Sequence, residues 1–260
     1  MFLSGLPDFD FSHRLFLDVL QRIGVIYLLS GAIFLVTGPR GQAAVSLVCI
    51  VLYWLLMVLI PVPGYGAGIL DPQGNVWQYV DNLVIAGWHY HAEGILSIIP
   101  SISTVLLGSL AGYWLRSERP GYEKAAGLFV AGNVGLLAGS IMAIWFPINK
   151  LLWSPSYVVF MAGCALEVFG VCYWLMDLRQ VRSPFTPFVA LGMNAIASFF
   201  LSSLTSRLMG MWNLKGPLYH ALYTSWLPEI NASLAYAIVY VVVWTIVAFI
   251  LYKRKIFIKI

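Results

Sequence analysis

Long apolar runs alternate with short polar segments along the whole chain. Most of these runs approach the roughly 20 residues that a helix needs to cross a hydrocarbon core about 30 Å thick. Prolines stand at or near the ends of the runs, where helices tolerate proline best. The pattern predicts about seven transmembrane helices, at residues 15–36, 43–60, 95–115, 123–146, 152–176, 185–207 and 230–252.

Composition supports the membrane class. Of the 260 residues, 60% are hydrophobic and 10% are charged, whereas soluble domains carry about 25% charged residues. We therefore expect an all-α, polytopic membrane helical bundle that forms a single transmembrane domain over residues 1–260, with a long extracytoplasmic loop at 61–94. The net charge of +4 comes mainly from short loops, so it does not indicate nucleic-acid binding.

The short loops differ in charge, and this difference predicts orientation. Lysine and arginine concentrate in one set of loops, which the positive-inside rule makes cytoplasmic. The opposite segments are mainly acidic or polar. An odd number of spans then puts the N-terminus in the extracytoplasmic space and the C-terminus in the cytoplasm. The cytoplasmic set contains Arg40, Arg116, Arg119, Lys124, Arg179, Arg182, Lys253, Arg254, Lys255 and Lys259.

Charged residues gather at the start of the first predicted helix. Arg14, Asp18 and Arg22 are spaced i, i+4 and i+8, so they share one helix face, and Gln21 is adjacent. Two interpretations stay open for this face. It forms either a structural ion pair or a site for an anion or a carbonyl group, because two guanidinium groups outnumber one carboxylate.

Two further polar residues lie inside predicted spans. Glu167 is costly in a bilayer, so it is either protonated or directed at the bundle interior or a watery cavity. Asn194 has small neighbours and serves either helix association or ligand binding. Cys49, Cys164 and Cys172 lack any metal-binding or disulfide spacing and are interpreted as packing residues.

The segment 61–94 is too long for a simple connector, and such loops usually carry function. His89, His91 and Glu93 near its end suit acid–base chemistry, whereas His-x-His alone is a weak metal signal. Interface packing is therefore favoured there over a metal site. A second outer turn contains Asn149 and Lys150.

Motifs spread over nearly the whole chain carry a family resemblance. In order, they are DVLQRIGVIYLL (18–29), PVPGYGAGILDPQGN (61–75), YVDNLVIAG (79–87), AEGILSIIPSISTVLLGSLAG (92–112), FPINKLLWSPSYVV (146–159), GMNAI (192–196) and LYKRKIFIKI (251–260). Together they resemble the heparan-α-glucosaminide N-acetyltransferase family of transmembrane acetyltransferases and its bacterial relatives.

The resemblance implies transfer of an acetyl group from cytoplasmic acetyl-CoA to an extracytoplasmic amino sugar or glycan, in a bacterial inner membrane. Acetyl-CoA would be a co-substrate, with no covalently bound cofactor and no metal. The partners would be the lipid bilayer and the acceptor, not nucleic acid. The residues expected around the acyl-CoA or substrate cavity are Arg14, Asp18, Gln21, Arg22, Asn149, Lys150, Trp153 and Asn194.

The chain also departs from the family pattern. Family members begin with about four further spans, including the loop that bears the histidine thought to act in acetyl transfer, and this chain starts after that region. The catalytic residues are therefore unassigned, with His89, His91 and Glu93 as candidate replacements. A homodimer or a missing N-terminal membrane segment is a further expected partner. A non-catalytic sugar or anion transporter and an inactive truncated fragment stay open as alternatives.

Overall fold

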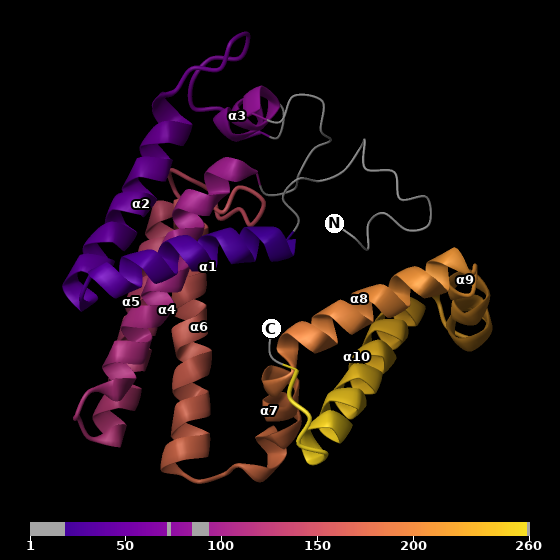
Figure 1. Ribbon diagram of the computed structural model, residues 1–260. Coiled ribbons are helices and arrows are strands. Elements are labelled where there is room, and N and C mark those ends of the chain that lie inside the picture. The colour runs from indigo at the N-terminus through magenta and orange to yellow at the C-terminus, as the bar shows by residue number, and fades with distance from the viewer. Residues whose placement is uncertain (1–18, 72–73, 85–93, 259–260) are drawn as a thin grey trace. The chain divides into compact units, whose positions relative to one another are not determined.

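Figure 1 shows a computed structural model, which describes residues 19–71, 74–84 and 94–258. Within these ranges all regular secondary structure is helical, apart from an isolated β-bridge between Val62 and Gly66. The helices form two compact units, of which the first ends at Arg179 and the second begins at Gln180. The all-helical class is thereby confirmed.

The first unit contains most of the helices. Proline stands in the first turn of α2 and α6, where its missing N–H costs no hydrogen bond. The elements are α1 (Val19–Val36), α2 (Pro39–Leu59), α3 (Val76–Val84), the 3₁₀ turn η2 (Ile95–Ser97), α4 (Ile98–Arg116), α5 (Gly121–Met142), α6 (Pro155–Tyr173) and the π-turn η3 (Trp174–Leu178).

The second unit is smaller and ends in a long helix. Its elements are the 3₁₀ turn η4 (Ser183–Phe185), α7 (Thr186–Met193), α8 (Ala195–Met211), α9 (Lys215–Tyr219), the π-turn η5 (His220–Thr224) and α10 (Glu229–Lys253). Helix α10 packs mainly against α7.

The structure supports five or six spans instead of about seven. Among the described residues, the apolar helix Gln21–Val36 is shorter than the others, and α7 with α8 qualifies only as a pair bent by 72°. If this pair is one span, the total is six. The helices that are long and apolar enough to cross a membrane are Pro39–Leu59, Ile95–Arg116, Gly121–Met142, Pro155–Leu178 and Glu229–Lys253.

Helix α3 lies inside the segment that the sequence predicted as a loop. Its Trp77 is 2% exposed and belongs to a buried apolar cluster at one end of the first unit. Gly94 follows this segment with φ +47°, and a Cβ there would lie 1.7 Å from Trp77 Nε1. Helix α3 is therefore packed against the first unit through Val76 and Trp77. The other buried members of the cluster are Tyr53, Met57, Val62, Val76, Phe146 and Leu152.

Helices α5 and α6 form the closest helix pair in the first unit, and glycines allow their approach. A Cβ on Gly163 would lie 2.6 Å from the backbone nitrogen of Leu136 and 2.8 Å from the carbonyl oxygen of Gly132. Likewise, a Cβ on Gly139 would lie 2.6 Å from the backbone of Phe160. Small residues at such interfaces let membrane helices pack backbone to backbone.

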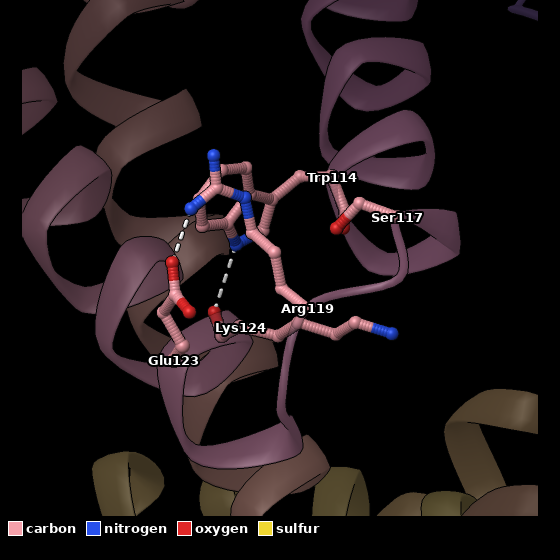
Figure 2. Close-up of polar contacts among 5 residues, drawn as sticks. All are labelled: Trp114, Ser117, Arg119, Glu123 and Lys124. Atoms are coloured by element: carbon pink, nitrogen blue, oxygen red, sulfur yellow. Dashed lines mark hydrogen bonds and ion pairs between the residues drawn. The ribbon is translucent and has the colours of Figure 1, made fainter.

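The turn between α4 and α5 is held by a group of polar contacts (Figure 2). The indole Nε1 of Trp114 donates to the carbonyl oxygen of Lys124 at 2.9 Å, and the Arg119 guanidinium lies 4.7 Å from the Trp114 ring centroid. Arg119 also forms an ion pair with Glu123. The Lys124 amine points away from this group (Figure 2). These contacts order a loop that the sequence predicted to be cytoplasmic.

Candidate functional site

Arg22 on α1 is the charged side chain around which the candidate site forms. It is 7% exposed, and its Nη2 donates to the Ser101 hydroxyl oxygen at 2.6 Å and to the Ser97 carbonyl oxygen at 3.5 Å. A charged residue buried among apolar helices is expensive and usually functional. Its contacts join α1 to the start of α4, a helix 75 or more residues further along the chain.

Trp153 covers the Arg22 guanidinium. Its ring centroid lies 4.4 Å from Arg22 Cζ, which is a cation–π geometry. The indole Nε1 also donates to Thr104 Oγ1 at 3.2 Å, and the ring meets Tyr157 edge to face at 5.3 Å. Trp153 has φ 51°, a left-handed conformation that costs on the order of 1–3 kcal/mol for a non-glycine residue. The contacts with Arg22, Thr104 and Tyr157 hold Trp153 in this strained conformation, with its ring against the Arg22 guanidinium.

The α5–α6 turn supports Trp153 through its own hydrogen bonds. Asn149 Oδ1 accepts from the backbone N–H groups of Leu151 and Leu152 at 2.8 and 3.3 Å. Ser154 caps α6 by accepting from the Tyr157 N–H at 3.2 Å, and its Oγ also accepts from the Asn149 N–H. The Asn149 side-chain oxygen is therefore engaged in shaping the turn, as expected of an asparagine in this position.

A buried tyrosine anchors the same turn to α2. The Tyr53 hydroxyl donates to the Leu152 carbonyl oxygen at 2.6 Å, and Tyr53 is 0% exposed. This bond holds the turn against α2 at Leu152, the residue before Trp153. The turn thus connects Arg22 to the core of the first unit.

The predicted cavity residues do not all have the same surroundings. The structure brings Arg22 and Trp153 together, and Gln21 is half-buried on α1 beside Arg22, whereas Lys150 is exposed. The predictions for Arg14, Asp18, His89, His91 and Glu93 fall on residues outside the described part of the chain.

Asn194 belongs to the second unit, where it separates α7 from α8. It is 1% exposed; its Nδ2 donates to the Ile256 carbonyl oxygen at 3.2 Å, and its Oδ1 accepts from the Ile258 N–H at 3.0 Å. The side-chain amide therefore binds the backbone that follows α10. Both the nitrogen and the oxygen of the side-chain amide thus have a structural role, and they join the motif GMNAI (192–196) to the motif LYKRKIFIKI (251–260).

Glu167 has a partner that the sequence did not reveal. Asn133 Nδ2 on α5 donates to Glu167 Oε1 at 2.7 Å and to the Phe129 carbonyl oxygen at 2.9 Å. Glu167 also lies against Gly132, where a Cβ would be 2.5 Å from Oε1. The pair joins α5 and α6, so we interpret it as a helix-pairing contact.

Sequence reasoning missed the groups that bind Arg22 and Trp153. The Ser101 hydroxyl and the Ser97 carbonyl accept from Arg22, and the Thr104 hydroxyl accepts from Trp153. Ser97, Ser101 and Thr104 lie in the apolar stretch SIIPSIST, at a spacing of three or four residues that places them on one helix side. That spacing was a usable signal, since serine and threonine repeated on one side of an apolar helix often hydrogen-bond a neighbouring helix.

The arrangement around Arg22 suits an anionic or strongly polarised oxygen. A guanidinium group binds phosphate or carboxylate oxygens with charge-assisted hydrogen bonds, and it can stabilise an oxyanion that develops during acyl transfer. The Trp153 face and the Ser101 hydroxyl restrict the orientation of this group. Such preorganisation is what electrostatic stabilisation of a transition state requires.

Similarity to known proteins agrees with this chemistry. No protein-family model matches the chain. Human heparan-alpha-glucosaminide N-acetyltransferase is 27% identical over 299 aligned residues, which cover 93% of this chain and 43% of the human protein. The mouse protein of the same name is 27% identical over 244 residues, which cover 80% of this chain and 36% of the mouse protein. This chain thus spans less than half the length of these curated relatives, and it is a distant relative of the heparan-alpha-glucosaminide N-acetyltransferases.

Proposed function

We propose that this chain is a membrane acetyltransferase module, which moves an acetyl group from cytoplasmic acetyl-CoA to an extracytoplasmic amino sugar or glycan. The similarity to two N-acetyltransferases supports the reaction class. The observation that carries the proposal is the contact between Arg22 and Trp153, because it joins two of the segments on which the family resemblance depends. The predicted bacterial inner membrane and the predicted orientation of the termini belong to the same proposal.

In the proposed reaction, an acceptor amine attacks the thioester carbonyl carbon. A C–N bond forms, the C–S bond breaks, and the carbonyl oxygen carries negative charge in between. Arg22, fixed by Ser101 and Trp153, would stabilise that oxygen. A general base takes the proton from the amine and returns it to the departing thiolate of CoA. His89, His91 and Glu93 remain hypotheses for the base.

The proposal also includes a partner for this chain. This partner would be an N-terminal membrane segment or a second copy of the chain; the human relative, of which the match covers 43%, is longer than this chain. Acetyl-CoA binding is therefore measured separately from acetyl transfer, so that a donor site can be detected even when transfer is slow.

The test uses the full chain in lipid nanodiscs, with labelled acetyl-CoA and glucosamine as the acceptor. The informative variant is Arg22→Lys, which keeps the charge but loses the planar group that stacks on Trp153. Loss of one oxyanion donor lowers kcat by about 10²–10³, and we expect a decrease of that order with little change in acetyl-CoA affinity.

The matched control is Arg119→Lys, since Arg119 also lies over a tryptophan ring but is exposed in the α4–α5 turn. This variant should keep wild-type transfer. The proposal is wrong if the wild-type chain neither binds acetyl-CoA nor transfers acetyl, or if Arg22→Lys transfers as fast as wild type.

A further inference from the structure

A row of polar side chains, most of them buried, runs between α1, α2 and α4 in the first unit. It begins at Arg22, which contacts Ser101 on α4, and continues along α4, where Ser103 and Ser109 contact α2. Its extent along α4, from Ser97 to Ser109, is about 18 Å at the usual rise per residue, more than half of a hydrocarbon core. We name this row the polar seam; its members are Arg22, Ser30, Gln42, Ser46, Ser97, Ser101, Ser103 and Ser109.

Hydrogen bonds join the helices along most of the polar seam. Beyond the Arg22–Ser101 contact, the Ser103 hydroxyl on α4 donates to the Ser46 carbonyl oxygen on α2 at 2.9 Å. Further along, the Ser109 hydroxyl donates to Gln42 Oε1 at 2.8 Å. Ser103, Ser46 and Gln42 are each at most 2% exposed. The polar seam therefore lies inside the packed helices instead of on their surface.

Two hydroxyl groups in the polar seam have no partner within the described part of the chain. They belong to Ser30 on α1 and Ser46 on α2, and both residues are 2% exposed. Ser30 lies two helical turns after Arg22, on the same face of α1, and Ser46 lies one turn after Gln42 on α2. A buried hydroxyl without a hydrogen bond costs about 1–3 kcal/mol. Neither hydroxyl bonds the carbonyl one turn earlier, which is the usual local solution in membrane helices.

We propose that water molecules bind in the polar seam at Ser30 and Ser46, and that they connect Arg22 to the end of the first unit at which α2 begins. Buried water typically satisfies such polar groups and needs two to four partners. Around Ser46 the Ser103 hydroxyl, which bonds the Ser46 carbonyl, and Gln42, one turn earlier on α2, supply further partners. Hydration of this kind makes a guanidinium tolerable at membrane depth. The inference uses the packing alone and does not depend on acetyl transfer.

Cys49 provides a probe inside the polar seam. It lies one turn after Ser46 on α2 and is half-buried. Cys164 on α6 is also a half-buried free thiol near the middle of its helix, but α6 contributes no residue to the polar seam as defined. Cys49 therefore lies on a helix of the polar seam, and Cys164 serves as the reference thiol on a helix outside it.

The experiment is radiolytic hydroxyl labelling of the full chain in nanodiscs, with thiol oxidation followed by mass spectrometry. Radicals formed from bound water react first with the nearest side chains. We expect Cys49 to be oxidised several-fold faster than Cys164. Ser46→Ala and, separately, Ser30→Ala should each slow the oxidation of Cys49 toward the rate of Cys164, while the rate at Cys164 stays constant.

A constant Cys164 rate also shows that the variants remain folded, because unfolding would expose both thiols. Equal oxidation of Cys49 and Cys164 in the wild-type chain would overturn the proposal. So would fast oxidation of Cys49 that neither serine variant changes, since the water would then not be held by these hydroxyls. Neither result bears on acetyl-CoA binding.

Discussion

Replacing Gly163 with alanine should force α6 away from α5 and destabilise the first unit. The new Cβ would lie 2.6 Å from Leu136 N, 2.8 Å from Gly132 O and 2.9 Å from Gly135 C, whereas ordinary contact begins at 3.4 Å. All three atoms belong to the backbone, so no side chain can rotate away. Overpacking of this kind costs about 1–3 kcal/mol. Alanine also favours a helix by about 1 kcal/mol over glycine, and we expect the overpacking to exceed this gain.

The matched control is Gly108→Ala on α4, where an added Cβ meets nothing within 4 Å. This variant gains the helix propensity without the clash, so it should be as stable as wild type or slightly more stable. Thermal unfolding in detergent, followed by tryptophan fluorescence, measures both. At about 2–4 °C per kcal/mol for a chain of this size, Gly163→Ala should lower the Tm by several degrees. An unchanged or raised Tm for Gly163→Ala would refute the close packing of α5 on α6.

Three further predictions concern single hydrogen bonds. Tyr53→Phe leaves the Leu152 carbonyl without its donor and should lower the free energy of unfolding by about 1–3 kcal/mol; a Tm equal to wild type would contradict the anchoring bond. Ser154→Ala removes the cap of α6 and should cost about 0.5–2 kcal/mol, whereas Ser154→Asp, which can also cap, should restore much of this stability. Asn194→Ala should speed amide hydrogen exchange at Ile258, and unaltered exchange there would show that the side-chain bond is not needed to hold this segment.

The turn between α5 and α6 could be predicted because its chemistry is local. Pro147 cannot continue a helix, and asparagine readily bonds the backbone two residues ahead of it. The structure has this Asn149–Leu151 bond. Ser154 followed by Pro155 is likewise a typical helix start, and α6 begins at Pro155. Neighbouring residues are sufficient to determine such features.

Two parts of the fold differ from the prediction for identifiable reasons. A helix was not predicted in the segment 61–94, although Val76, Val80 and Val84 are spaced as an apolar helix face; its glycines and prolines obscured that signal. The predicted span 185–207 is divided at Asn194, because this side chain bonds the backbone at Ile256 and Ile258. A hydrogen bond between residues more than 60 positions apart cannot be recognised from the spacing of neighbouring residues.

By itself the sequence determined the membrane class, the approximate ends of the apolar helices and the local turns, since each depends on the composition and order of adjacent residues. Only the tertiary structure decided that Arg22, Ser101 and Trp153 meet, and that Glu167 pairs with Asn133. The physical reason is that helical spacing defines which residues share a face, while the partner of that face depends on how closely two distant helices can pack.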